Sequence, residues 1–353
     1  MKKVVIDKYI PFEGRPFAGI ADVWRLAPGE FTPEAVRDAD ALIVRTRTKC
    51  GPALLDGSRV SIVATATIGT DHLDLPWLAS RGIKTVSAPG CNAPAVAQYV
   101  LASIFSLGLG QPGMRLGVVG LGHVGSIVAS WALNFGMDVL ACDPPRDIRD
   151  HGWNTSSPLE AGDAPFLSIV EVGRKADVVT FHTPLTRQGG HPTWHLLDRD
   201  FINLGPKALV INAARGAVAD NRDLTGSLRR GRISAAAIDC WEGEPSISPD
   251  LLRLAAISTP HIAGYSIEGK KRATAVTFNA VLKHFGSERR IPPGVVMTPP
   301  SGVTLDALMT SYDPVADSLP LKTDPASFER LRNTYPLRHE VAATTSPASQ
   351  ASK

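Results

Sequence analysis

The chain has few cysteines and no metal-ligand motif. Its four cysteines stand alone at positions 50, 91, 142 and 240, without a CxxC pair, and His182, His191 and His195 are not spaced like a metal site on one helix. This excludes a disulfide scaffold and leaves no metal predicted. A reducing, cytoplasmic compartment fits this cysteine usage best.

The sequence also lacks a long apolar run and a concentrated basic region. The longest apolar run, Tyr99–Leu109, is about half as long as a membrane span and contains Gly108. The N-terminal segment Met1–Asp7 reads as a strand and not as an export segment. The net charge is only +3, with dispersed basic residues. We therefore expect no membrane and no nucleic-acid partner, and a small anionic substrate instead.

Short apolar runs alternate with helical segments along most of the 353 residues. This βαβ rhythm predicts an α/β fold with two Rossmann-like, doubly wound parallel-sheet domains and an interdomain cleft, the helix Pro94–Leu107 crossing between them. The first group of predicted strands is Val4–Ile6, Ala41–Val44, Ile62–Ala64 and Lys84–Ser87. The second group is Leu116–Val119, Met137–Cys142, Val178–Phe181, Ala208–Ile211, Ala235–Ile238 and Ala256–Ile257.

A glycine triplet predicts a dinucleotide site. Gly120-Leu-Gly-His-Val-Gly125 stands between the strand Leu116–Val119 and a predicted helix, Ser126–Phe135. Such glycines allow a tight turn and a close backbone approach to a pyrophosphate, which the helix N-terminus stabilises. Asp143 follows the next strand, where a carboxylate can bind the adenosine ribose and repel a 2′-phosphate, so the site favours NAD over NADP. Arg146 could offset part of that repulsion, and a glycine-rich turn without ligand is the alternative.

Four reactive side chains each follow a strand of the second group: Thr183, Arg215, Asp239 and His261. Because ligands of open α/β sheets lie beyond the carboxyl ends of strands, these residues should converge on one edge. Arg215 offers a planar fork for a carboxylate. His261 can exchange a proton near neutral pH, and Glu244 could stabilise its protonated form. Taken singly, each of the three could instead be structural: a surface ion pair, a loop carboxylate or a core histidine.

These residues resemble a known family. Arg215, Asp239-Cys-Trp-Glu-Gly-Glu-Pro245 and Pro260-His-Ile-Ala-Gly264 are similar to the signature of the D-isomer-specific 2-hydroxyacid dehydrogenases. Within this group, the segments Ala64–His72 and His261–Lys270 resemble the erythronate-4-phosphate dehydrogenase subfamily of vitamin B6 biosynthesis. The similarity spans roughly residues 3–286.

The resemblance implies a role for each matched residue. The catalytic residues would be Arg215, Glu244 and His261, with His261 as acid/base. The NAD contacts would be Gly120, Gly122, His123, Val124, Gly125, Asp143, Thr183, Asp239 and Gly264. The substrate contacts would be Thr46, Thr67 and Tyr265.

A phosphorylated substrate needs cations on the loops of the first domain. Arg45, Arg47 and Lys49 cluster there, and alternation along an extended segment would point all three to one side. We expect Arg45 and Lys49 among the substrate contacts, while a solvated charged loop is an equally good account of each cation.

The resemblance implies a domain layout. Residues 1–93 and 263–286 would form the substrate domain, 94–262 the NAD domain and 287–341 a shortened C-terminal dimerisation-type segment, with a disordered tail at 342–353. The expected reaction is NAD-dependent oxidation of 4-phospho-D-erythronate by a homodimer, although the shortened segment puts the dimer in doubt. The alternatives are a dehydrogenase for 3-phosphoglycerate, glyoxylate or hydroxypyruvate, and an NAD-sensing corepressor-like protein.

Overall fold

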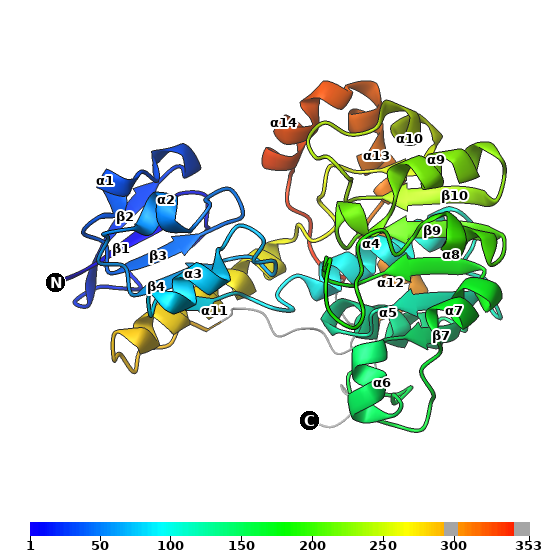
Figure 1. Ribbon diagram of the computed structural model, residues 1–353, viewed down its shortest axis with the longest axis horizontal. Coiled ribbons are helices and arrows are strands. Elements are labelled where there is room, and N and C mark those ends of the chain that lie inside the picture. Colours follow the sequence, from blue (N-terminus) through cyan, green and yellow to red (C-terminus); the bar gives the residue numbers. More distant parts are fainter. Residues whose placement is uncertain (293–302, 342–353) are drawn as a thin grey trace, which may run out of the picture. The chain divides into compact units, whose positions relative to one another are not determined.

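The computed structural model describes residues 1–292 and 303–341, which divide into two compact units. Both are built on parallel sheets with helices on both faces (Figure 1), as the sequence predicts. The first unit takes residues 1–92 and continues from 266, and the second takes 93–265 and the C-terminal residues from 303 to 341. Residues 263–265, predicted in the substrate domain, therefore lie in the second unit. The predicted tail at 342–353 lies outside the described residues.

The first unit has a five-stranded sheet in the order β2-β1-β3-β4-β5. Alternate side chains of its strands pack against short helices on one face and against α11 on the other, which Figure 1 shows in yellow. The strands are β1 (Lys2–Asp7), β2 (Ala21–Leu26), β3 (Ala41–Val44), β4 (Ile62–Thr65) and β5 (Lys84–Val86). The helices are η1 (Pro28–Glu30), α1 (Pro33–Val36), α2 (Pro52–Leu55), α3 (Leu75–Ser80) and α11 (Ile267–His284).

Strand β2 is absent from the sequence-based prediction. It pairs with β1 at the edge of the sheet, and its residues Asp22, Val23, Trp24 and Arg25 are exposed. An exposed edge strand needs no apolar run, so the pattern that reveals buried strands does not reveal this one.

The second unit has a six-stranded parallel sheet in the order β11-β10-β9-β8-β6-β7. Each predicted strand of this group is confirmed within two residues at either end. The strands are β6 (Arg115–Val119), β7 (Asp138–Cys142), β8 (Val178–Phe181), β9 (Lys207–Asn212), β10 (Ile233–Ile238) and β11 (Ile257–Ser258). One face packs against α4 (Ala93–Ser106), α5 (His123–Asn134) and α12 (Leu305–Ser311). The other packs against α7 (Ile169–Lys175), α8 (Arg199–Asn203), α9 (Asn221–Arg229) and α10 (Pro249–Leu254).

The C-terminal segment folds onto the second unit beside strand β11. It contains α12, α13 (Pro314–Thr323), η3 (Pro325–Ser327) and α14 (Phe328–Asn333). The backbone N–H of Ser258 donates to Ser318 Oγ at 2.8 Å, and Lys322 Nζ donates to the carbonyl of Ala256 at 3.2 Å. These contacts from α13 cover an edge strand that would otherwise expose unpaired backbone groups.

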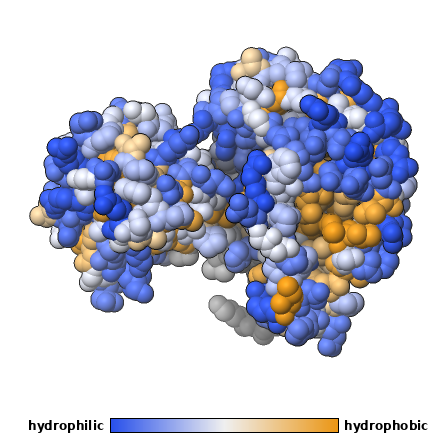
Figure 2. Space-filling view, viewed as in Figure 1, coloured by the Kyte–Doolittle hydropathy of each residue, from blue (hydrophilic) through white to orange (hydrophobic). Residues whose placement is uncertain are grey.

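The surface of each unit is mixed in character. Figure 2 shows hydrophilic residues over most of the visible surface and a gathering of hydrophobic residues on one area of the second unit. None of the helices in the described part of the chain is long and apolar enough to cross a membrane.

Candidate active site

The glycine loop lies where the strand order of the second sheet reverses. The chain runs from β6 to its neighbour β7 on one side and then to β8 on the other, so the carboxyl ends of β6 and β8 border a crevice. Gly120 has φ +90°, and a Cβ there would lie 2.9 Å from the backbone of His182. A Cβ on Gly125 would lie 1.9 Å from the Gly120 carbonyl oxygen. These two glycines are therefore required by the protein's own packing.

Gly122 is different, because a Cβ there would meet no protein atom within 4 Å. It is the N-cap of α5, whose first residues are the exposed His123 and the partly buried Val124. Open space in front of a twelve-residue helix N-terminus is where a pyrophosphate binds in such folds.

Two polar side chains border the same loop. Asp143 follows β7, and its carboxylate accepts from the backbone N–H groups of Leu121 at 2.8 Å and Arg146 at 3.1 Å. Thr183 follows β8, and its buried hydroxyl has no hydrogen-bond partner among the described residues. The Asp143 carboxylate has further lone pairs, and the Thr183 hydroxyl is unsatisfied. Both groups border the open glycine loop, which fits a bound dinucleotide.

Arg146 has a role besides the one expected of it. Its buried guanidinium donates to Asp150 Oδ2 at 2.8 Å and to the carbonyls of Leu121, Pro158 and Glu160 at 2.7–3.1 Å. It thereby ties down the segment that follows α6 (Pro144–Asp150). Its guanidinium therefore makes four hydrogen bonds within the protein, and the expectation that its charge offsets part of the repulsion of a 2′-phosphate stays a prediction.

Glu244 and His261 form the hydrogen-bonded pair that the sequence suggests. His261 Nδ1 lies 2.9 Å from Glu244 Oε2 and 3.1 Å from Oε1. The side chains are 18% and 29% exposed, so the pair is shielded but open to a ligand. Burial raises the pKa of Glu244, but hydrogen bonds from His261 and from the Trp241 N–H, with the charge of Arg332, outweigh it and hold that pKa below its ordinary value.

His261 is held in a strained backbone conformation. Its φ is +58°, in the left-handed region that side chains other than glycine rarely adopt. Its N–H donates to the Asp239 carbonyl at 2.9 Å. The Asp239 carboxylate accepts from Thr259 Oγ1 at 2.7 Å and from the N–H groups of Ile262 and Ala263 at 2.8 and 3.0 Å. The loop around the histidine is thus anchored on both sides of it.

Asp239 therefore holds the His261 loop. Its side chain is 1% exposed, and burial raises the pKa of its carboxyl despite the surrounding donors. The expected NAD contact of Asp239 stays a prediction, as does that of Gly264, which follows the anchored residues.

Arg215 lies on the loop after β9, and this loop contacts the one that carries Glu244. A Cβ on Gly216 would lie 2.0 Å from the Trp241 carbonyl oxygen, so glycine permits this contact. Asn212 Nδ2 donates to the carbonyls of Arg215 at 2.9 Å and Gly216 at 3.2 Å. Trp241 Nε1 donates to the Thr259 carbonyl at 2.9 Å, which joins the Glu244 and His261 loops. Sequence reasoning missed Asn212 and Trp241 as supports, although Trp241 lies within the quoted segment Asp239–Pro245 and Asn212 stands three residues before Arg215.

Cys240 lies beside the pair. One ligand atom each from Cys240, Glu244 and His261 lie within 4.8 Å of one another. Burial raises the pKa of the thiol well above its usual range, with the carboxylates of Asp239 and Glu244 contributing.

Four of the five expected substrate residues, Thr46, Thr67, Arg45 and Lys49, belong to the first unit. Thr46 is exposed and Thr67 Oγ1 lies 2.7 Å from Thr65 Oγ1, while Arg45 Nε donates to Asp7 Oδ2 at 2.9 Å. Lys49 lines a recess of about 350 Å³.

The alternation expected for Arg45, Arg47 and Lys49 is wrong. The Thr48 N–H donates to the Arg45 carbonyl at 3.1 Å, which closes a turn directly after β3. A turn removes the two-residue periodicity on which the expectation rested.

Tyr265 belongs to the second unit, and an arginine from the C-terminal segment contacts it. Arg332 Nε donates to the Tyr265 hydroxyl at 3.3 Å, and its Nη1 lies 3.7 Å from Glu244 Oε2. Sequence reasoning missed Arg332. It stands in the segment Phe328–Tyr335, whose spacing carries no information about a residue ninety positions away.

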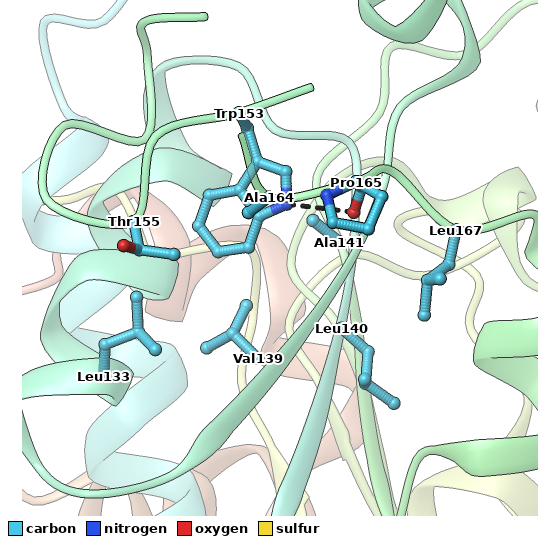
Figure 3. Close-up of a pocket in the computed structure, with 9 residues that line it drawn as sticks. All are labelled: Leu133, Val139, Leu140, Ala141, Trp153, Thr155, Ala164, Pro165 and Leu167. Carbon is cyan, nitrogen blue, oxygen red and sulfur yellow. Dashed lines mark hydrogen bonds between the residues drawn. The ribbon is translucent and has the colours of Figure 1, made fainter. Parts of the chain in front are cut away.

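One apolar recess of about 230 Å³ lies outside these residues. Figure 3 shows Trp153 over Val139 of the edge strand β7, with the indole N–H donating to the Pro165 carbonyl at 3.3 Å. None of the expected site residues lines it. It is therefore separate from the glycine loop and from the Glu244–His261 pair.

The second unit has a glycine loop at the switch point of a doubly wound sheet. A carboxylate–histidine pair follows strands of the same sheet. Together these features define a dinucleotide-dependent dehydrogenase. Residues 103–263 match the family model described as D-isomer specific 2-hydroxyacid dehydrogenase, NAD binding domain. The chain belongs to the erythronate-4-phosphate dehydrogenase family within this group. It is 41% identical over 355 residues to an erythronate-4-phosphate dehydrogenase of Bacteroides fragilis, covering 97% of this chain and 98% of the relative.

Solved structures agree on the fold. The TT0316 protein of Thermus thermophilus is 27% identical, with a TM-score of 0.67 over 81% of this chain and 98% of that one. A Staphylococcus aureus formate dehydrogenase in complex with NAD is 20% identical, with a TM-score of 0.64 over 83% of this chain and 98% of that one, and shows the fold alone.

The alignment with the Bacteroides relative corrects one expectation. Similarity was expected to end near residue 286, with a shortened segment after it. Instead it covers 97% of the chain and 98% of the relative's length. The C-terminal segment is therefore part of the family resemblance, and it is not short by comparison with this relative.

Proposed function

We propose that the protein oxidises 4-phospho-D-erythronate to (3R)-3-hydroxy-2-oxo-4-phosphooxybutanoate with NAD, as a step of pyridoxal 5′-phosphate biosynthesis. The observation that carries the proposal is the Glu244–His261 pair at 2.9 Å, in a chain 41% identical to an erythronate-4-phosphate dehydrogenase. The relatives' names favour this substrate over 3-phosphoglycerate, glyoxylate and hydroxypyruvate.

His261 is the base of the proposed reaction. Its Nδ1 faces Glu244, so Nε2 is the nitrogen that takes the proton of the substrate's 2-hydroxyl. The Glu244 carboxylate stabilises the imidazolium that forms and fixes the orientation of the ring. The left-handed backbone of His261, anchored through Asp239, keeps the ring from moving during the transfer.

Arg215 would hold the substrate carboxylate. Arg215 lies on a loop that Asn212 joins to the Glu244 loop, because Asn212 Nδ2 donates to the carbonyls of both Arg215 and Cys240. One hydrogen-bond network therefore supports the loops that carry the cation and the partner of the base. A bidentate arginine orients the acid group and polarises the neighbouring oxygen as the ketone forms.

The glycine loop, Asp143 and Thr183 would hold the cofactor. When bound, NAD accepts the hydrogen of substrate C2 with its electron pair. The open space at Gly122, the Asp143 carboxylate and the buried Thr183 hydroxyl support this assignment. The Asp143 carboxylate would repel a 2′-phosphate, which supports NAD over NADP.

Thr46, Thr67 and Tyr265 are proposed substrate contacts, with Arg45 and Lys49 for the phosphate. Burial and, to a smaller extent, the charge of Arg45 lower the pKa of Lys270 to about 8, so these two basic side chains lie close enough to interact. Concentrated positive charge favours an anion.

The test supplies purified protein with 4-phosphoerythronate or 3-phosphoglycerate, NAD or NADP, and a 2-oxo acid as recycling acceptor, and follows products by mass spectrometry. We expect the protein to oxidise 4-phosphoerythronate to the corresponding 2-oxo acid product, with NAD as the cofactor. Product only from another 2-hydroxy acid would overturn the substrate. NAD binding without any product would favour a cofactor-sensing protein.

We propose further that the protein is a cytoplasmic homodimer. Four buried cysteines without a disulfide support a reducing compartment. Leu305, Val315 and Leu319 are large apolar residues that are exposed on α12 and α13, which supports a partner surface on the C-terminal segment. Light scattering on the purified protein tests the dimer, and the mass of one chain would refute it.

A further inference from the structure

The C-terminal segment places a guanidinium against the Glu244–His261 pair. Arg332 lies on α14, and its side chain is only 15% exposed. Its Nη1 lies 3.7 Å from Glu244 Oε2, the oxygen that is 2.9 Å from His261 Nδ1. The same carboxylate oxygen therefore stands between two nitrogen groups that can both carry positive charge.

Arg332 also contacts an expected substrate residue. Its Nε donates to the Tyr265 hydroxyl at 3.3 Å, and the Tyr265 ring packs against Tyr335, with centroids 6.2 Å apart. Nε and Nη1 are fixed in one plane, so a single arginine spans Glu244 and Tyr265. A lysine has one nitrogen at the end of a flexible chain and could not hold both partners.

We propose that Arg332 is a positioning residue that sets the pH range in which His261 works as a base and orients Tyr265 toward the substrate. The proposal rests on the proposed function in one respect, namely that His261 is the base. Nothing in the family signature assigns this arginine a role.

The physical reason is competition for one carboxylate. Glu244 stabilises the protonated ring of His261, whereas the nearby cation Arg332 destabilises it and shares the charge of Glu244. Removing Arg332 is therefore expected to favour the protonated ring of His261. Among the described residues, the other titratable or charged groups around the pair include Asp239, Cys240, Arg215, Tyr265 and Arg338, which donates to the Ile262 and Ala263 carbonyls. A variant of Arg332 leaves the identity of each of these groups unchanged.

The charge has a calculable effect. For two cations roughly 6 Å apart with an effective dielectric constant of about 20–80, Coulomb's law gives about half to two pH units. Removing Arg332 should move the acid limb of the pH–rate profile for hydroxy-acid oxidation to higher pH, whereas removing the charge of Glu244 should move it to lower pH. A residue that merely supports the fold would move neither.

The experiment compares R332Q and R332K with the matched control R330Q. Arg330 lies on the same helix, carries the same charge and is 65% exposed, with contacts to Asp324 and Ser327. Two quantities are measured: the pH midpoint at which the His261 ring titrates, by NMR of histidine-labelled protein without substrate, and the pH profile of kcat and KM.

We expect R332Q to raise the titration midpoint and the acid limb by about half to two pH units, and to raise KM roughly three- to tenfold through the loss of Tyr265. R332K should keep the midpoint near that of the parent and still raise KM, and R330Q should change neither quantity. If R332Q does not fold, the KM values of R332K and Y265F test the contact between Arg332 and Tyr265. The titration midpoint of R332K then tests the effect of the charge.

A midpoint in R332Q equal to that of the parent would overturn the proposal. The NMR titration needs no turnover, so this result is distinct from failure of the proposed function, in which the parent would not oxidise 4-phosphoerythronate. An equal rise of KM in R330Q and R332Q would also overturn it, because the effect would then belong to the helix and not to the contact.

Discussion

Replacing Glu244 by glutamine tests how the pair works, because the substitution removes a charge and keeps the shape. An amide oxygen in the place of Glu244 Oε1 can still accept from the Trp241 N–H, which lies 2.7 Å from Oε1, and from His261 Nδ1, which lies 3.1 Å from it. The ring should therefore keep its orientation and lose only the anion that stabilises its protonated form. Arg332 would then act on the ring without an intervening negative charge.

The expected result is a shift of the acid limb for hydroxy-acid oxidation to lower pH. A hydrogen bond to a charged group contributes about 1.5–3 kcal/mol, and each 1.36 kcal/mol corresponds to about one pH unit, so the shift should be about one to two units. The direction follows because the base must be neutral, and without Glu244 the neutral ring is available at lower pH. Turnover on the plateau should fall as well, since the imidazolium formed during the reaction loses its partner.

The assay is the initial rate of NADH formation from pH 5 to 10 under saturating substrate, with circular dichroism and NADH binding as controls for folding. His261→Ala serves as the reference and should lose the limb together with most of the activity. A limb in the parent's position, in a folded Glu244→Gln protein that binds NADH, would show that another residue tunes the base.

Four further substitutions probe the remaining parts of the site. Arg215→Lys should lower kcat/KM by about tenfold to ten-thousandfold with NAD binding intact, because the charge stays and the bidentate fork is lost; rates within twofold of the parent would remove Arg215 from the site. Asp143→Ala should raise the use of NADP relative to NAD, measured as the ratio of kcat/KM values, and an unchanged ratio would make Asp143 a structural cap of α6. Gly125→Ala should lower the unfolding free energy by about 1–3 kcal/mol because its Cβ meets the Gly120 oxygen, whereas Gly122→Ala should leave stability unchanged and weaken NAD binding, as denaturant titration and calorimetry can show; equal effects of the two alanines would contradict this division.

The sequence by itself determined the strands and the nucleotide loop. Buried parallel strands such as β3 and β8 are continuous apolar runs, and their pattern survives in any tertiary setting because both faces of the sheet are covered. The turn at the glycine loop is also local, since Gly120 has φ +90° and a Cβ on Gly125 would meet the carbonyl oxygen of Gly120, whereas the approach of Gly120 to the His182 backbone is a tertiary contact. The position of these glycines after a strand already indicated a dinucleotide site.

The turn after β3 and the edge strand β2 were decided by the structure. Charged residues at 45, 47 and 49 have the spacing of an extended segment, but a hydrogen bond from Thr48 to Arg45 makes a turn of them. Strand β2 has hardly any buried side chains, so its sequence pattern does not predict a strand. Its pairing with β1 stabilises it.

Only the tertiary structure decided what supports His261. The carboxylate of Asp239, which follows β10, accepts from the backbone N–H groups of Ile262 and Ala263 on the loop after β11, and no local pattern of the sequence shows this support. Arg332 reaches Glu244 across nearly ninety residues because α14 packs on the second unit. Periodicity and spacing describe neighbours along a chain. The position of the Arg332 charge beside the Glu244–His261 pair depends instead on which distant segments pack together, and the packing of the whole unit determines that.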